Sequence, residues 1–596
     1  MTNPKNRLSD ESSAYLRAHA GDPVNWRPWD AKTFAEARSI GKPIFLSIGY
    51  QSCHWCHVMQ RESFRDTDTA KTLNGGFVPV KVDREMRPDV DALYMAYVQA
   101  STGSGGWPMS VFLTPEGLPI FGGTYFPYRG RGEQMPSFRQ VMSAVHHSWK
   151  LSREDTLELG REALEFLREQ QEGARGPITR EMLDAACEGL LDAEDPEFGG
   201  FGRTPKFPQA PLIAFLTQYA HLTADARPAR AALRAVLAML RGGAYDQAGG
   251  GLFRYSTDAQ WLVPHFEKML YDQGLLLSSL ASLEPFTERA ERAELAHYAR
   301  ATARFLAHAL ARPSGGYFSS LDAEAGGVEG ETYAWTHEAL SEVLAPEQLA
   351  HAEEFLGVTA EGNWERSTNL LTRRAGRAAE GERAAEVDGV LEAIARARAG
   401  RVQPAVIDNV IVSWNALTAR GLIEAGAAYG EPDLFDTGRE CVRWLVETAV
   451  SRSGDVRHTV EDRPAGRVRF LEDYSAVCAA LIADGTAGGD TTRLRLARKV
   501  HDLAIKRFRT PAGLVMSVGD PALPLPVIDT SDAPTPSGPA LLAENALALA
   551  STGGPNTGRE AALDALGQCG RTAAVAPALA GYAMAVQARL LAPSEE

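Results

Sequence analysis

The sequence predicts two domains, an α/β domain followed by an all-α ring of helical hairpins. The chain has 596 residues, which exceeds the size at which a single hydrophobic core keeps growing. Short β-like runs alternate with helical patterns up to about residue 175, and Ala/Leu/Arg-rich amphipathic segments follow to the end of the chain. Between these two regions, residues 171–177 are polar and contain the glycine and proline typical of a linker.

Residues 1–170 form the predicted α/β domain. Its β-like runs are Lys42–Ile48, Phe77–Val82 and Pro108–Leu113, and segments with helical spacing of apolar residues separate them. A charged helix over about residues 151–170 ends the domain. This alternation of strand and helix is typical of an α/β fold.

Residues 178–590 form the predicted all-α domain. About a dozen amphipathic segments follow one another there, for example Ala231–Leu240 and Ala540–Ala550. Several of them are joined by glycine-rich loops that carry an aromatic residue, such as Gly249–Phe253. One loop type that recurs between helices indicates hairpin repeats. Because no sharply fixed repeat length is visible, we expect the hairpins to close into an α/α toroid rather than an open solenoid.

Composition and charge exclude several classes of protein. Hydrophobic residues make up 44% of the chain and charged residues 23%, as in ordinary globular domains. The net charge of −15 repels phosphate backbones, so we expect no nucleic-acid partner. The first residues, Met1–Asp10, contain no apolar stretch, and no run of about 18 apolar residues follows. We therefore expect a cytoplasmic protein with no membrane partner.

Cysteine usage singles out one motif. Six cysteines in this length are too few for a disulfide-stapled scaffold. Cys53 and Cys56 form the only CxxC pair, and they follow an apolar run and a short Gly/Ser turn. A CxxC that opens a helix after a strand predicts a thioredoxin-like redox site. The other four cysteines stand alone and are expected in the core: Cys187, Cys441, Cys478 and Cys569.

The chemistry of the pair follows from its position. At a helix start, free N–H groups and the helix dipole favour an anion, which predicts a lowered pKa for Cys53 and makes it the nucleophile. Cys56 lies on the same face and is the predicted resolving thiol. A cationic His54 would lower the Cys53 pKa further. Pro108 enters the strand that faces this helix and is the predicted cis-proline. We expect no cofactor, and a protein thiol or disulfide as the partner.

Two other interpretations of the motif stay open. The string Cys53-x-x-Cys56-His57 matches the c-type haem attachment motif, and with His54 the same residues offer ligands to zinc. Haem attachment usually belongs to exported chains. Zinc would need a second ligand pair, and no second CxxC or HxxxH is present in the sequence. The redox interpretation is therefore favoured, and no metal is expected.

Seven short segments of the chain carry a family resemblance: Asn25–Trp29, Lys42–Gly49, Cys53–Met59, Val82–Glu85, Gly105–Pro108, Phe121–Pro127 and Trp261–Asp272. They resemble the YyaL and spermatogenesis-associated thioredoxin-like family over nearly the whole chain. This resemblance implies an N-terminal thioredoxin-like fold followed by a six-hairpin (α/α)6 toroid similar to glycoside hydrolases and sugar 2-epimerases. It indicates the architecture better than the substrate.

Carboxylates and aromatic residues gather in the loops of the second domain, where sugar-processing toroids place a substrate funnel. Pro264 suits a first helical turn, so we expect His265 and Asp272 on one helix face and Glu267 pointing away from His265. A histidine and a carboxylate would supply the two pKa values needed for acid–base catalysis. The candidate cavity residues are Asp246, Tyr255, His265, Glu267, Asp272, Asp322, Trp414, Asn415, Glu472 and Asp473.

Three functions are compatible with these observations. The first is a thiol-disulfide oxidoreductase fused to a carbohydrate-enzyme-like toroid. The second is a carbohydrate-active enzyme, of the glycoside hydrolase or sugar epimerase type, in which the thioredoxin-like module is structural or regulatory. The third is a non-catalytic scaffold. Two cysteines at a helix start favour the first, and the toroid candidates are expected around a single cavity that takes a carbohydrate.

Overall fold

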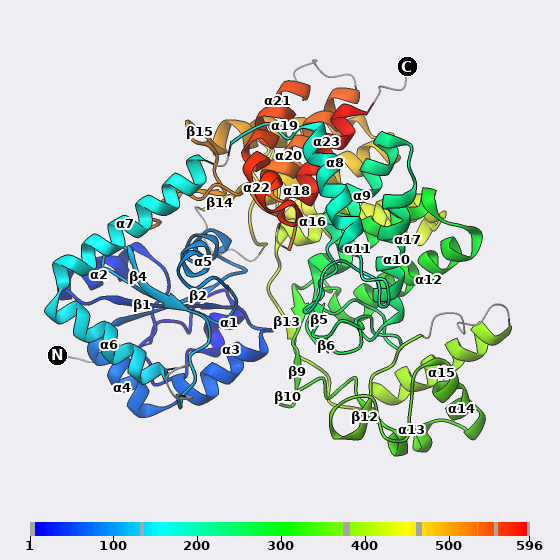
Figure 1. Ribbon diagram of the computed structural model, residues 1–596, viewed down its shortest axis with the longest axis horizontal. Helices are drawn as coiled ribbons and strands as arrows, with labels where there is room; N and C mark the ends of the chain where they lie inside the picture. Colours follow the sequence, from blue (N-terminus) through cyan, green and yellow to red (C-terminus); the bar gives the residue numbers. More distant parts are fainter. Residues whose placement is uncertain are drawn as a thin grey trace.

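The computed structural model describes residues 6–130, 136–173, 175–373, 382–460, 468–532, 534–552 and 558–592. A sheet with its helices forms the N-terminal part, coloured blue to cyan in Figure 1, and helices in green to red form the rest. The predicted order, an α/β unit followed by an all-α unit, is confirmed. The predicted linker, residues 171–177, overlaps the end of helix α7 (Arg153–Glu172) and precedes α8 (Arg180–Asp192).

One four-stranded sheet organises the N-terminal part. Its strands are β1 (Ile44–Gly49), β2 (Val78–Asp83), β3 (Met109–Leu113) and β4 (Pro119–Gly123), in the order β2-β1-β3-β4. β1 and β2 are parallel, whereas β3 is antiparallel to β1 and to β4. The three β-like runs of the sequence correspond to β1, β2 and β3. This order and these directions are those of a thioredoxin-like fold.

Helices join the strands and cover the sheet, and the helix that follows β1 carries the cysteine motif. Helix α3 (His54–Met59) follows β1 after a four-residue turn, and α5 (Pro88–Thr102) connects β2 to β3. Side-chain caps at Asp66 and Ser137 start two further helices. The remaining helices of this part are α1 (Ala14–Ala18), α2 (Ala31–Ile40), α4 (Thr67–Gly76) and α6 (Phe138–Leu151).

Twelve alternating helices form a closed ring. Each inner helix packs against the next inner helix, and the last packs against the first. An outer helix lies between each pair of neighbours, so the ring consists of six hairpins and is the predicted (α/α)6 toroid. The inner helices are α9 (Ala210–Thr223), α11 (Leu270–Leu283), α16 (Val412–Tyr429), α18 (Leu471–Ala487), α20 (Gly538–Ser551) and α23 (Gly581–Leu591). The outer helices are α8, α10 (Arg227–Arg241), α12 (Arg289–Phe305), α17 (Pro432–Thr448), α19 (Thr491–Phe508) and α21 (Gly558–Leu566).

Residue pattern explains which helices lie inside. Helix α18 buries residues around its whole circumference, with only occasional exposed positions. Helix α19 buries a single stripe that includes Ala497, Val500 and Ala504 at helical spacing. A helix that is apolar all round must be enclosed on all sides, whereas an amphipathic helix can face water. The first kind therefore forms the inner wall of the ring and the second kind the outer wall.

An insertion between α12 and α16 departs from the predicted simple ring. It contains helices α13 (His337–Val343), α14 (Pro346–Phe355) and α15 (Glu382–Arg398) around a small core of their own. The same connection carries short strands β8 (Ser320–Leu321), β9 (Glu324–Ala325) and β10 (Val328–Glu329). In Figure 1, β9 and β10 lie beside the N-terminal part. Helical periodicity alone does not separate such an insertion from ring helices.

The two parts share buried surface. Leu525 and Val527, from the loop before α20, pack into the apolar cluster under the sheet. The indole N–H of Trp29 donates to Asp520 over 3.0 Å.

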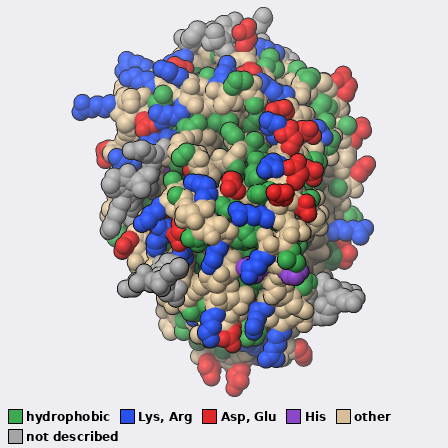
Figure 2. Space-filling view, turned by 90° about the vertical axis from the view of Figure 1, so that its left-hand side faces the viewer, with side chains coloured by type: hydrophobic (Ala, Val, Ile, Leu, Met, Phe, Trp, Pro, Cys, Tyr) green, Lys and Arg blue, Asp and Glu red, His purple; other side chains and the backbone are tan. Residues whose placement is uncertain are grey.

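On the face drawn in Figure 2, basic and acidic side chains both occur across the surface. None of the described helices is long and apolar enough to cross a membrane.

Two inner helices approach each other at glycines. A Cβ added at Gly421 of α16 would lie 2.2 Å from the carbonyl oxygen of Gly274 in α11, closer than atoms can pack. We therefore expect Gly421→Ala to lower the free energy of unfolding by about 1–3 kcal/mol through overpacking. Gly189→Ala, in outer helix α8, meets open space and should instead stabilise by about 0.5–1 kcal/mol. Thermal unfolding midpoints of both variants check this, and equal midpoints would contradict it.

Candidate active site

The cysteine pair lies at the start of α3. Strand β1 ends at Gly49, α3 begins at His54, and Cys53 is the N-cap residue. The Cys53 sulfur accepts a hydrogen bond from the backbone N–H of Cys56 over 3.3 Å. Both thiols are free, with exposed fractions of 4% for Cys53 and 2% for Cys56. The strand, turn and helix that the motif predicts are therefore present, but the sulfurs are more enclosed than the sequence suggests.

Pro108 lies next to this helix start. The peptide bond between Trp107 and Pro108 is cis, so the predicted conformation is confirmed. Pro108 directly precedes β3, whose first residue, Met109, pairs with Ile48 at the end of β1. The proline thus enters the strand beside the one that leads to Cys53. Its part in catalysis stays a prediction.

The electrostatic environment divides the two thiols. Burial, the adjacent Cys56 and the carboxylate of Glu267 raise the pKa of Cys53 well above its usual value. Burial also raises the pKa of Cys56, but the Cys53 thiol, a backbone N–H and the charges of Lys81 and His57 outweigh it and lower that pKa. The predicted lowering of the Cys53 pKa is therefore wrong. The helix start does supply an N–H, but burial and the anion at Cys53, together with the cations at Cys56, make Cys56 the more acidic thiol of the pair.

The anion beside Cys53 comes from the ring. The hydroxyl of Tyr50 donates to Oε1 of Glu267 over 3.1 Å, and Nε2 of His265 donates to the same oxygen over 2.8 Å. Nδ1 of His265 donates to Glu329 over 2.8 Å. Burial alone would lower the pKa of His265, but the two carboxylates raise it to about 10, so the ring is an imidazolium. Tyr255 stacks on it, with ring centroids 5.0 Å apart.

A second set of ring residues holds the flank of α3. Asp322 accepts a hydrogen bond from Nε2 of His57 over 3.1 Å, and Glu324 accepts one from Nδ1 of His54 over 2.7 Å. Arg61 donates to the other oxygen of Glu324 over 2.9 Å. These contacts tie the segment that leads into β9 to the cysteine helix, as the neighbouring positions of β9 and α3 in Figure 1 indicate. Ring loops therefore cover the dithiol.

The local structure around His265 differs from the expected helix. Pro264 and His265 form a short strand that pairs with Tyr255 and Ser256, and α11 begins only at Leu270. In extended backbone, side chains two residues apart point to the same side. Glu267 therefore meets His265 instead of pointing away, and the helical expectation is wrong. Pairing with a neighbouring loop overrides the preference of proline for a first helical turn.

Four further candidates lie away from the dithiol contacts described above. Asp272 pairs with Arg254 over 3.4 Å, and burial raises its pKa to about 7. Trp414 and Glu472 line a separate cavity of about 500 Å³ between the ring and the N-terminal part. Asp473, next to Glu472, accepts the backbone N–H of Ser413.

Asp246 and Asn415 have structural roles. Asp246 forms ion pairs with Lys268 over 2.7 Å and Arg398 over 2.8 Å. Although burial opposes it, these cations hold the pKa of Asp246 well below its usual range. Asn415 donates to the backbone of Tyr317 and accepts its N–H. The expectation of a single cavity is therefore wrong. The structure places one group of candidates at the dithiol and another at the cavity, whereas Asp246 and Asn415 lie at neither.

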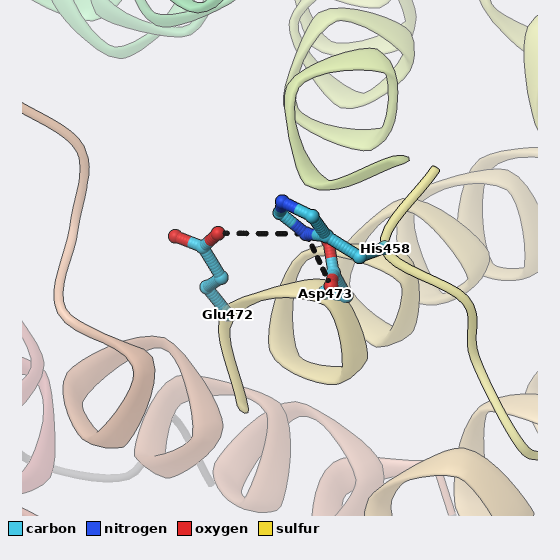
Figure 3. Close-up of side chains that lie close together, drawn as sticks. All are labelled: His458, Glu472 and Asp473. Atoms are coloured by element: carbon cyan, nitrogen blue, oxygen red, sulfur yellow. Dashed lines mark hydrogen bonds and ion pairs between the residues drawn. The ribbon is translucent and has the colours of Figure 1, made fainter. Parts of the chain in front are cut away.

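One histidine beside the cavity resembles a metal ligand. His458, Glu472 and Asp473 place ligand atoms within 4.8 Å of one another (Figure 3). Nδ1 of His458 donates to Asp473 over 2.8 Å, and Nε2 donates to the carbonyl of Glu85 over 2.7 Å. Burial opposes protonation, but Asp473 and Glu472 raise the pKa of His458 to about 10. A metal at this group would have to replace the Nδ1 proton of His458. With that proton in place, the imidazolium pairs with Asp473 and lies 3.9 Å from Glu472.

Several functional positions escape the sequence analysis. Tyr50, Glu324 and Glu329 have no motif of their own, since each acts through a partner far away in the chain. Arg84 lies in the segment Val82–Glu85, directly after a β-like run, where charged residues often face a site at the end of a strand. Its position directly after a β-like run is the one feature of the local sequence that indicates Arg84.

Glu267 gives the site a testable property. Removal of its negative charge by Glu267→Gln should lower the pKa of Cys53 and make Cys53 alkylate several-fold faster at pH 7, because more of it is thiolate. The matched control is Glu329→Gln, which removes a charge on the far side of His265. Alkylation rates from pH 6 to 10, resolved by residue with mass spectrometry, measure the effect. A Cys53 profile unchanged in Glu267→Gln would show that the ring does not set its reactivity.

Comparison with known proteins places the chain among relatives. Residues 5–168 match the family model Thioredox_DsbH, described as a protein of unknown function, DUF255. The chain is 33% identical to uncharacterized protein B0495.5 of Caenorhabditis elegans, over 91% of this chain and 80% of that protein. It is 35% identical to human spermatogenesis-associated protein 20, over 91% of this chain and 76% of that protein. A cellobiose 2-epimerase from Bacillus thermoamylovorans B4167 matches with a TM-score of 0.42 and 9% identity, over 65% of this chain and 85% of that one. From the identity to its relatives over nearly its whole length, the chain belongs to the family of spermatogenesis-associated protein 20.

Proposed function

We propose that the protein is a thiol-disulfide oxidoreductase that uses Cys53 and Cys56. One observation carries the proposal: two free thiols lie at a helix start, with the Cys53 sulfur on the N–H of Cys56. Burial and an anion at Cys53, and cations at Cys56, give the two sulfurs unequal acidity, and exchange proceeds through the thiolate form. We place this chemistry in the cytoplasm, where thiols stay reduced.

The reaction conserves atoms and electrons. Cys56 is the more acidic thiol, so the form of the pair that reacts holds its proton on Cys53 and its negative charge on Cys56. As Cys53 attacks a partner disulfide, its proton moves to Cys56, a mixed disulfide forms and one partner thiolate leaves. The Cys56 sulfur then attacks Cys53, its proton passes to the second partner sulfur, and the intramolecular disulfide closes. Two electrons have moved to the partner, which leaves as one thiol and one thiolate.

Burial constrains the partner. Cys53 is 4% exposed and lies beneath loops that pair with His54 and His57, so its sulfur is out of reach of a cysteine on a broad folded surface. The partner thiol or disulfide therefore lies on a narrow segment of a protein, or the ring loops separate from α3 before it reacts. On either route, the ring loops help to determine which partners can react with Cys53.

A second function, carbohydrate binding by the ring, is favoured by the cavity of about 500 Å³. We infer this role from its lining, because Tyr271 and Trp414 offer aromatic faces and Glu472 a carboxyl group, as sites for hydroxylated ligands do. Burial and Asp473 raise the pKa of Glu472 to about 7, which suits hydrogen-bond donation as well as acceptance. Neither His265 nor Tyr255 lies in the lining, so the cavity supports binding more directly than acid–base catalysis.

The redox proposal is tested by trapping. Cys56→Ala lacks the resolving thiol, so it should accumulate mixed disulfides with client proteins, whereas Cys53→Ala should accumulate none. Cys441→Ser, which removes a buried cysteine outside the motif, should behave as wild type. Non-reducing gels and mass spectrometry identify the adducts. Trapping by Cys53→Ala alone would reverse the two roles, and a wild-type pair that forms no disulfide in a dithiothreitol redox titration would end the proposal.

A further inference from the structure

The cavity at the mouth of the ring has walls from both parts of the molecule. From the ring come Tyr271 and Trp414 near the starts of inner helices, Glu472 at the start of α18, and Asp529 from the loop before α20. From the N-terminal part come Asp91 and Ala96 of α5, together with Arg84, Glu85 and Trp107. The thioredoxin-like part therefore closes the end of the ring where its inner helices begin.

The charges in this cavity are unequal. Four carboxyl groups line it, from Glu85, Asp91, Glu472 and Asp529, against one guanidinium, that of Arg84. Arg84 already pairs with Asp91 over 3.7 Å, and its guanidinium carbon lies 3.9 Å from the ring centroid of Trp107. The cavity thus lacks cations, and an added cation would gain energy from its carboxylates.

The carboxyl group of Glu85 is incompletely hydrogen-bonded. Glu85 is 4% exposed and its Oε2 accepts the amide of Asn409 over 2.8 Å, whereas its buried Oε1 has no hydrogen bond of good geometry among the described residues. A buried polar atom without a partner is costly. The lining also holds amide and hydroxyl groups, including Gln99, Gln171 and Ser531, which match hydroxyl groups.

We propose that this cavity binds a small hydroxylated amine and that the thioredoxin-like part supplies one wall, so that neither part alone forms the site. The proposal extends the carbohydrate-binding candidate and does not depend on the redox chemistry. The ammonium group of the ligand lies among the carboxylates, and the hydroxyl groups of the ligand face the amides and the aromatic rings. The volume, about 500 Å³, lies within the range of small-molecule sites. An anionic ligand would meet like charges on both walls.

The carboxyl groups also set the pH dependence. Burial raises the pKa of Asp529 to about 6, and burial with Asp473 raises that of Glu472 to about 7. Burial and Asp83 raise the pKa of Glu85 to about 8. These groups are neutral at low pH and become anionic as pH rises, so binding of a cation should strengthen from pH 5.5 to 8. Arg84 with its partner Asp91, the His458–Asp473 pair and Asp532 beside Asp529 are further charged or titratable groups that face them.

Three probes with one carbon skeleton test the charge preference. These are 1-amino-1-deoxy-D-glucitol, D-glucitol and D-gluconate, which differ in charge at one end. The aliphatic ammonium of the first stays protonated up to pH 8, so its pH dependence reports on the protein. Ligand-observed NMR titration of the full chain gives each dissociation constant. We expect the amine to bind at least about fivefold more tightly than the neutral polyol, the anion most weakly, and the amine more tightly at pH 8 than at pH 5.5.

Variants locate the site and test the shared wall. Ala96→Phe, on α5, fills the cavity from the thioredoxin-like part and should abolish amine binding, whereas Ala100→Phe, on the exposed face of the same helix, should not. Glu472→Gln should reduce the preference for the amine over D-glucitol and leave D-glucitol binding nearly unchanged. Thermal unfolding midpoints confirm that each variant is folded.

The outcomes separate the two ideas. Equal binding of the amine and D-glucitol overturns the proposal and leaves carbohydrate binding in place. Tightest binding of D-gluconate, or amine binding that survives Ala96→Phe, also overturns it. If none of the three probes binds, both the proposal and the carbohydrate-binding candidate fail, while the trapping of clients by Cys56→Ala is unaffected.

Discussion

The contact between the cysteine helix and the loops of the ring is the constraint on which the rest of the site depends. Glu267 accepts the hydroxyl of Tyr50, and Asp322 accepts His57. Each contact joins residues more than 200 positions apart in the chain. Together they bury the sulfurs, place an anion beside Cys53 and hold His57 near Cys56. Burial opposes protonation of His57, but Asp322 raises its pKa. A dithiol with the same helix start but no ring above it would be more exposed, and Cys53 would lose the negative charge of Glu267 that helps to raise its pKa.

One interface serves two sites. The dithiol lies on one side of it and the cavity on the other, and Arg84 stands between them. Its guanidinium carbon lies 3.9 Å from the ring centroid of Trp107, which precedes the cis-proline, and 5.3 Å from that of Tyr50, which leads to Cys53. Arg84 therefore lies in the wall of the cavity and also packs on side chains beside the cysteines. This arrangement gives a physical reason for the fusion of a thioredoxin-like fold to a helical ring.

Much of the fold could be predicted from the sequence, because its signals are local. Apolar runs mark β1, β2 and β3, helical periodicity marks the ring, and the CxxC after a strand marks the start of α3. The candidate site could be predicted only in part. The resemblance implied the toroid type, but the meeting of His265 and Glu267 depends on pairing of Pro264–His265 with another loop. The charges that reverse the acidity of Cys53 and Cys56 likewise come from Glu267 and Lys81, which no spacing near the motif reveals.

The relative access of a small and a large reagent to Cys53 measures how far the ring loops cover the dithiol. Cys53 is labelled with N-ethylmaleimide and with a 5-kDa polyethylene-glycol maleimide, and the ratio of the two rates removes effects of thiol pKa. In wild type, the bulky reagent should react far more slowly than the small one. The double variant Asp322→Asn/Glu324→Gln removes the carboxylates that hold His57 and His54. In this variant the labelling rate of the bulky reagent should rise relative to that of the small one. Equal rates for both reagents in wild type would contradict the account.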